Sequence, residues 1–125
     1  MEARAEARFI RMSPRKARLV LDLIRGRDAN DAVNLLRFTK KRAAREVQKV
    51  LRSAIANAEF VADQGKVTLD VDNLYVAAAY AGDGPRAKRI RPAPMGRAHP
   101  YQRRTCHIVV QVAERVETAR AAESS

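Results

Sequence analysis

Alternation of apolar and polar residues predicts extended segments near both ends of the chain and in its middle. Apolar and charged or polar residues alternate over 3–9, where Phe9 is the last apolar position, and again over 67–72 and 106–112. An apolar stretch, 74–81, continues the middle segment. A period of two places alternate side chains on opposite faces of a strand, so we expect a small antiparallel sheet with one apolar face.

A helical period predicts the most clearly marked helix between Ser13 and Gly26. Ser13 suits the N-cap because its hydroxyl can accept a free backbone N–H, and Pro14 suits the first helical position. Gly26 suits the left-handed conformation that follows many helices. The apolar stripe that this helix would bury consists of Ala17, Val20, Leu21 and Ile24.

Two further helices are predicted downstream. Residues 28–38 suit a short helix capped by Asp28, and a longer helix runs from a Thr39 cap to about Phe60, before a turn at 63–66. The core stripe of the longer helix would be Val47, Val50, Leu51, Ala54 and Ala58.

These elements predict an α+β fold, with three helices packed on a small antiparallel sheet and a long protruding basic β-hairpin. A chain of 125 residues favours a single domain, here 1–115, which includes the hairpin at about 83–106. We call this hairpin the finger, and we expect a flexible C-terminal tail at 116–125. Each arm of the finger would hold about 10 residues, so at roughly 3.3 Å per residue its tip would reach about 30 Å from the body.

Charge adds a strong constraint on partners. The chain carries 25 Lys and Arg against 14 Asp and Glu, a formal net charge of +11, and its pI is about 10.8. Such a surface attracts polyanions, of which nucleic acid comes first, then anionic membranes and acidic proteins. We expect a soluble intracellular protein, because the N-terminus lacks the apolar core of a targeting segment and the longest apolar run is too short for a membrane span.

The segment 84–104 concentrates this charge, with seven positive residues, four prolines and no acidic residue. Charge-rich loops are commonly only solvated, and many are disordered. Here the charge has a single sign, and the prolines restrict the backbone, which lowers the entropy lost on ordering. Six of the seven cations are arginines, whose guanidinium groups match phosphate and stack on bases. Because further basic residues lie on the predicted body, we expect contact with structured RNA on several sides, read by shape and phosphate.

Catalytic and metal-binding motifs are absent from the sequence. Cys106 and His107 are neighbours on a predicted strand, so their side chains point to opposite faces and cannot form a dyad, and Cys106 is interpreted as a small core residue. One Cys and two His give no metal-ligand cluster, and 82–85 lacks the spacing and the lysine of a phosphate-binding loop. We therefore expect no enzymatic activity, cofactor, metal or small-molecule substrate.

An ordered set of motifs resembles one protein family. The motifs are SPRKAR (13–18), LIRG (23–26), SAIANA (53–58), and above all GPRAKRIRP (84–92) followed by GRA (96–98). The set is similar to the family of bacterial large-subunit ribosomal protein twenty-two, over residues 1 to about 115. The resemblance implies a small α+β body on the outer surface of the ribosome and a hairpin that enters the large subunit. It also implies binding to 23S-type rRNA and a role in organising that RNA during assembly.

The resemblance further implies that the tip of the finger lines the nascent-peptide exit tunnel, near the macrolide site. There it would face an extension of ribosomal protein four, with Gly96 allowing the tight turn. Partners would be rRNA, neighbouring ribosomal proteins and the nascent peptide, within the cytoplasmic ribosome and without a membrane. The tunnel-lining tip would consist of Lys88, Arg89, Ile90, Arg91, Pro92, Ala93, Pro94, Met95, Gly96 and Arg97.

The residues expected to bind rRNA come from the first strand, the first helix, the start of the third helix and the finger. They are Arg8, Arg11, Ser13, Arg15, Lys16, Arg18, Arg25, Lys40, Lys41, Arg42, Arg86, Lys88, Arg89, Arg91, Arg97, Arg103 and Arg104.

Two other functions stay open from the residues alone. A generic basic binder, such as an RNA chaperone or a nucleoid protein, would bind random duplexes nearly as well as rRNA. A protein-interaction module would dock its finger on an acidic partner, and its binding would survive nuclease treatment.

Overall fold

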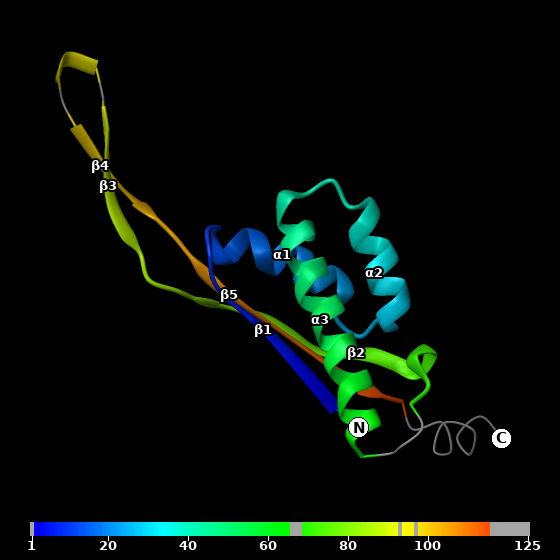
Figure 1. Ribbon diagram of the computed structural model, residues 1–125. Helices are drawn as coiled ribbons and strands as arrows, with labels where there is room; N and C mark the ends of the chain where they lie inside the picture. The colour runs from blue at the N-terminus through cyan, green and yellow to red at the C-terminus, as the bar shows by residue number, and fades with distance from the viewer. Residues whose placement is uncertain (1, 66–68, 93, 97, 116–125) are drawn as a thin grey trace.

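Three helices cover one face of a three-stranded antiparallel sheet, and a long hairpin extends from that sheet (Figure 1). The structure is a computed structural model that describes residues 2–65, 69–92, 94–96 and 98–115. Within these residues the α+β fold class is confirmed, whereas the predicted tail, 116–125, lies outside them. The elements are β1 (Glu2–Ile10), α1 (Pro14–Ile24), α2 (Ala29–Phe38), α3 (Arg42–Gln64), η1 (Val71–Asn73), β2 (Leu74–Asp83), β3 (Ala87–Pro92), η2 (Pro94–Gly96), β4 (Ala98–Arg103) and β5 (Cys106–Glu114).

Strand β5 lies at the centre of the sheet, antiparallel to β1 on one side and to β2 on the other. Val110 of β5 is opposite Ala5 of β1 and Ala79 of β2. The extended segments predicted at 3–9, 74–81 and 106–112 are therefore confirmed, apart from the end of the first one.

The core lies between the sheet and the helices, with α3 over β1 and β5, and α1 over β2. The apolar stripes predicted for the first and third helices are all buried, which confirms both patterns. On the sheet side, the alternate residues of β5 that point toward the helices are buried as well. These residues are Cys106, Ile108, Val110 and Val112.

Helix α1 begins and ends at the predicted residues, but its first turn is stabilised differently. Ser13 occupies the N-cap and its backbone carbonyl accepts from Lys16 N–H at 3.1 Å, yet its hydroxyl makes no capping hydrogen bond. The predicted hydroxyl cap is therefore wrong. Pro14 is the first helical residue, and Gly26 has a φ of +84°, the left-handed conformation that favours glycine.

The boundaries of α3 differ from the prediction at both ends. Its N-cap is Lys41, whereas Thr39 ends α2, where its hydroxyl donates to the Leu35 carbonyl at 2.7 Å. At the other end, Gly65 N–H donates to the Val61 carbonyl at 3.0 Å, so the helix runs on to Gln64. The predicted helix end near Phe60 and the start of the predicted turn at residue 63 are therefore wrong.

The alternation at 67–72 does not form a strand in the part that the structure describes. Asp70 caps the short helix η1, because its carboxylate accepts the backbone N–H of Asp72 at 3.0 Å. This local hydrogen bond turns the chain where the alternation predicts an extended segment. Residues 66–68, which include the start of that alternation, lie outside the description.

Phe9 is the second place where the alternation fails. The pairing of β1 with β5 shifts register between Ala7 and Ile10, and Phe9 within this bulge has a φ of +58°. An extra residue in a bulge reverses the side on which the next side chain points. Phe9 is therefore 62% exposed, and its predicted place on the apolar face is wrong.

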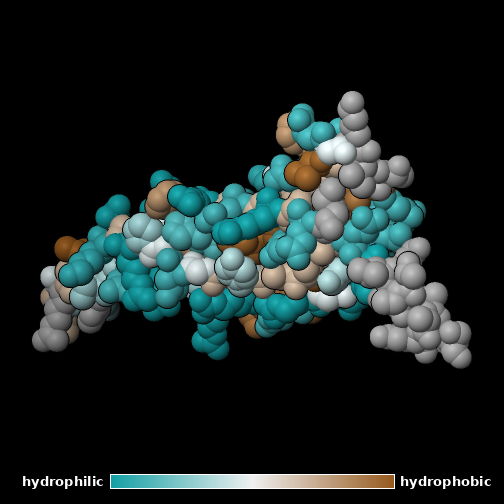
Figure 2. All heavy atoms as spheres, turned by 90° about the horizontal axis from the view of Figure 1, so that it is seen from below, coloured by the Kyte–Doolittle hydropathy of each residue, from teal (hydrophilic) through white to brown (hydrophobic). Residues whose placement is uncertain are grey.

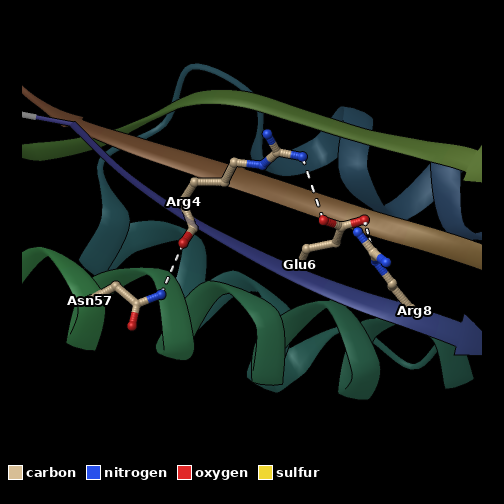
Figure 3. Close-up of polar contacts among 4 residues, drawn as sticks. All are labelled: Arg4, Glu6, Arg8 and Asn57. Carbon is tan, nitrogen blue, oxygen red and sulfur yellow. Dashed lines mark hydrogen bonds and ion pairs between the residues drawn. The ribbon is translucent and has the colours of Figure 1, made fainter.

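Side chains from the helices cover both edges of the sheet. At the β2 edge, the Arg18 guanidinium donates to the Ala81 carbonyl at 3.0 and 3.1 Å, and Arg25 donates to the Ala79 carbonyl. At the β1 edge, the Asn57 amide on α3 donates to the Arg4 carbonyl at 2.9 Å (Figure 3). Because unpaired edge groups favour association with other strands, these contacts protect the sheet.

Truncation of a core leucine tests this packing. Leu21 is fully buried, so Leu21→Ala should lower the free energy of unfolding by about 2–5 kcal/mol through the lost contacts and the cavity. Leu19 on the same helix is 51% exposed, so Leu19→Ala should change it by about 0.5 kcal/mol or less. Urea denaturation followed by circular dichroism measures both values. Equal losses in the two variants would contradict the assignment of the buried face.

Candidate nucleic-acid interface

The finger is a two-stranded ladder that continues beyond the body (Figure 1). Strands β3 and β4 pair in antiparallel register, with Arg89 opposite Tyr101 and Ala87 opposite Arg103. The chain reverses at Pro94–Gly96, where Met95 and Gly96 have φ values of +65° and +71°. Met95 lies at the tip of the finger, and 94% of the residue is exposed.

A tight hydrogen-bonded junction joins the finger to the body. Gly84 N–H donates to the Thr105 carbonyl at 3.0 Å, and the Thr105 hydroxyl donates to the Pro85 carbonyl at 2.6 Å. A Cβ atom on Gly84 would lie 2.5 Å from the Thr105 hydroxyl oxygen and 3.2 Å from its backbone. Glycine is thus required there by the close approach of the two arms.

The finger residues whose burial the structure describes contribute nothing to the core, because none of them between Gly82 and Thr105 is buried. Its cations Arg86, Lys88, Arg89, Arg103 and Arg104 are exposed, and Arg91 lies on β3. Two predicted tip residues, Ala93 and Arg97, lie outside the described residues.

The body carries a basic groove that adjoins the finger. One hollow lies between the start of α1 and the finger, and is lined by Ser13, Lys16 and Arg104 among others. A second shares Ser13 and Lys16 and reaches Lys41 and Arg42 at the start of α3, and a third continues from these two along the α2–α3 connection. We call these three hollows together the basic groove. Its cations are Arg11, Arg15, Lys16, Arg37, Lys40, Lys41, Arg42, Arg45 and Arg104.

Two helix N-termini add to the positive potential of the basic groove. Ser13 and Lys41, which line it, are the N-caps of α1 and α3, and neither side chain caps its helix. Neither helix has an acidic residue in its first turn. Free N–H groups at a helix N-terminus bind anions, so the helix ends and the cations favour the same kind of ligand. Glu46 is the single acidic residue among the side chains that line the described groove.

Five predicted RNA-binding residues make contacts within the protein. In the finger, Arg86 donates to the Gln102 side chain at 3.2 Å and Arg89 donates to the Lys88 carbonyl at 3.0 Å. Arg18 and Arg25 donate to β2 carbonyls, and Arg25 also pairs with Asp22 at 2.6 Å. Arg8 pairs with Glu6 at 3.2 Å on the face of the sheet opposite the helices (Figure 3). Their assignment to RNA binding stays a prediction. Leu19, Arg37 and Gln102 also line the groove but were not predicted from the sequence, because only the folded chain brings them beside the other groove residues.

Groups with other chemistry do not change this description. Cys106 is buried, and desolvation raises the pKa of its thiol, so the thiolate needed for nucleophilic chemistry is disfavoured. In the described residues, His, Cys, Asp and Glu nowhere gather in a group of three that could hold a metal ion. No helix of the described chain is long and apolar enough to cross a membrane. Seen from below, the surface is mostly hydrophilic, with scattered hydrophobic residues (Figure 2).

Comparison with known proteins gives similar sequences over most of the chain. The chain is 57% identical over 115 residues to the large ribosomal subunit protein uL22 of Solibacter usitatus (strain Ellin6076), which covers 92% of this chain and 98% of the relative. It is 54% identical over 117 residues to the protein of that name from Carboxydothermus hydrogenoformans, covering 94% and 99%.

These matches define the class as a structural ribosomal protein, without enzymatic activity. The chain belongs to the ribosomal protein L22p/L17e family, whose sequence model matches residues 5–113. The resemblance read from the motifs is therefore confirmed. As a member of this family the protein is a component of the ribosome, which in bacteria lies in the cytoplasm.

Shortening the finger tests whether the body folds without it. Joining Pro85 to Arg104 through Asn-Gly should leave the body folded, because no buried residue is lost and the Gly84–Thr105 junction remains. Closing the shorter loop costs less entropy, so the free energy of unfolding should rise by about 1 kcal/mol or less. Chemical denaturation measures it, and a fall of more than about 2 kcal/mol would contradict an independent body.

Proposed function

We propose that the protein is a structural constituent of the large ribosomal subunit that binds and organises large-subunit rRNA through its finger and basic groove. The single observation that carries the proposal is the continuity of the groove. It runs from Arg104 at the finger, past the start of α1, to Lys41 and Arg42 at the start of α3. The names of the relatives support the large subunit as its place.

The mechanism is electrostatic and geometric. Cations and helix N-termini in the groove replace the counterions of RNA phosphates, and the release of those counterions drives binding. The finger and the body contact RNA segments on different sides of the protein. Binding that requires both segments to be in place stabilises their folded arrangement, since a ligand stabilises the state to which it binds.

The finger tip supports a second part of the proposal, which is that it lines the nascent-peptide exit tunnel and faces ribosomal protein four. A ladder without a core can enter a narrow RNA-walled space because only two strands have to fit. Met95 at the turn presents an exposed apolar side chain rather than a charge. A passing peptide would therefore meet a nonpolar surface at this point.

Neutral substitutions in the groove test RNA binding. The double variant Lys16→Gln/Lys41→Gln should bind large-subunit rRNA more weakly, and the slope of log affinity against log salt should fall by about 1.4–1.8, because two phosphate contacts are lost. The control variant Arg27→Gln/Arg52→Gln removes the same charge from two exposed positions that do not line the groove.

Binding is measured by competition of labelled large-subunit rRNA against random RNA and duplex DNA over a range of salt. An equal effect of both double variants would contradict a localised site. Equal competition by all three nucleic acids would support a generic basic binder, and binding that survives nuclease treatment would support a protein partner.

Crosslinking tests the place of the tip. In the Met95→Cys variant a thiol reagent would label position 95. Cys106, the one native cysteine, is buried and the pKa of its thiol is raised, so it would react slowly. Labelled there with a photoreactive group and assembled into ribosomes, the variant should crosslink to a stalled nascent peptide. Phe60→Cys, at an exposed position on the body, is the control and should not. Equal crosslinking from both positions would rule out a tunnel-lining tip.

A further inference from the structure

Phe9 is an exposed aromatic residue in an unfavourable backbone conformation. Its φ of +58° lies in the left-handed region. This conformation is unfavourable for a bulky residue and is not unfavourable for glycine. The bulge turns its ring away from the core that the neighbouring alanines of β1 enter, so 62% of the residue is exposed. Burial therefore does not explain why the chain keeps this conformation, and strain of this kind is often found at functional sites.

His107 fixes the position of Phe9. The backbone N–H of Phe9 donates to His107 Nδ1 at 3.1 Å, so the hydrogen bond that β1 lacks at the bulge is made by a side chain 98 residues further along the chain. The two rings also meet edge to face, with centroids 5.1 Å apart and planes at 88°. This is a favourable geometry for an aromatic pair, and in it His107 covers at most one face of the Phe9 ring.

Phe9 has a cation on each side of it in the chain, one of which, Arg8, is paired with Glu6 at 3.2 Å. Arg8 precedes it and Arg11 follows two residues later, where it lines the basic groove together with Ser13 and Lys16. His107 on β5 lies opposite Gly82 on β2, at the root of the finger. Phe9 thus lies against the root of the finger through His107, and two residues before the groove residue Arg11.

We infer that Phe9, held by His107, is a stacking platform for one unpaired base of RNA. The inference rests on the proposed RNA-binding function and adds to it a contact with a base rather than with phosphate. Stacking on an aromatic side chain tolerates any base, because every base has a π face. Arg11 would hold a phosphate next to that base, and the fixed ring would bind the base with little loss of side-chain entropy.

Loss of the ring tests the platform. Two probes are used: an oligoadenylate, and a ribose-phosphate oligomer of the same length that carries no bases. Phe9→Ala should weaken binding of the oligoadenylate about 5- to 100-fold and leave binding of the abasic oligomer unchanged, since stacking is lost and charge is not. Phe60→Ala is the matched control, because Phe60 is 63% exposed and lies on α3 away from the basic groove.

Two further variants keep the test independent of folding. Phe9→Gly removes the ring and suits a positive φ, so it should keep the thermal midpoint of the wild type and still lose oligoadenylate affinity. His107→Asn keeps an acceptor near the position of Nδ1 and should bind oligoadenylate better than His107→Ala. Binding of oligoadenylate by Phe9→Gly within twofold of the wild type would overturn the inference, as would equal binding by the two His107 variants.

Fluorescence gives a direct readout. The chain contains no tryptophan, so Phe9→Trp introduces a single one at the platform, and Phe60→Trp does so at the control position. Oligoadenylate should quench the fluorescence of Trp introduced at position 9 and the abasic oligomer should not. Equal responses to both oligomers would indicate charge alone and overturn the inference. If the wild type still prefers rRNA over random RNA and duplex DNA in the groove experiment, the proposed function holds without the platform. If the wild type shows no such preference, the proposed function itself is contradicted.

Discussion

The antiparallel pairing of β2 with β5 is the interaction on which the rest of the structure depends. Within the body, β5 is bonded on both sides and its alternate residues, from Cys106 to Val112, form the sheet side of the core. Past the junction at Gly84 and Thr105, β2 continues into β3 and β5 is preceded by β4, so the arms of the finger extend the same two strands. The finger has no core to fix its direction, so it takes its direction from the sheet that anchors it. A register slip of one residue would move every side chain of β5 to the wrong face.

In this arrangement the cations lie on the finger and the groove, away from the apolar core. A chain with a net charge of +11 repels itself, and the fold reduces the repulsion by spreading cations along the finger and the groove. The free N-termini of α1 and α3 work in the other direction, because cations beside them are disfavoured by the helix dipole. Anions supplied by a bound partner remove both costs. The conformation of the free protein is therefore already suited to a polyanion.

Local signals in the sequence predicted most of the elements and the finger. Pro14 and Gly26 fix the ends of α1 within a few residues, and alternation at 106–112 identifies β5. Tertiary contacts account for what local signals missed. Phe9 turns outward because a histidine distant in sequence accepts its N–H, and Asp70 closes a turn where alternation favours a strand. The continuity of the groove arises only when α1, α3 and the finger are packed together.

Two of the cations predicted to bind RNA also complete the sheet of the body. Arg18 and Arg25 on α1 are bonded to the carbonyls of Ala81 and Ala79, which β2 leaves free at the edge of the sheet. An arginine suits this position because its long apolar stem can lie along the helix while several N–H groups reach the strand. Neutral groups would cover the edge equally well in an isolated protein. With arginine in place, the edge of the sheet keeps its positive charge beside the finger, so the residues that complete the fold also contribute to the positive field around it.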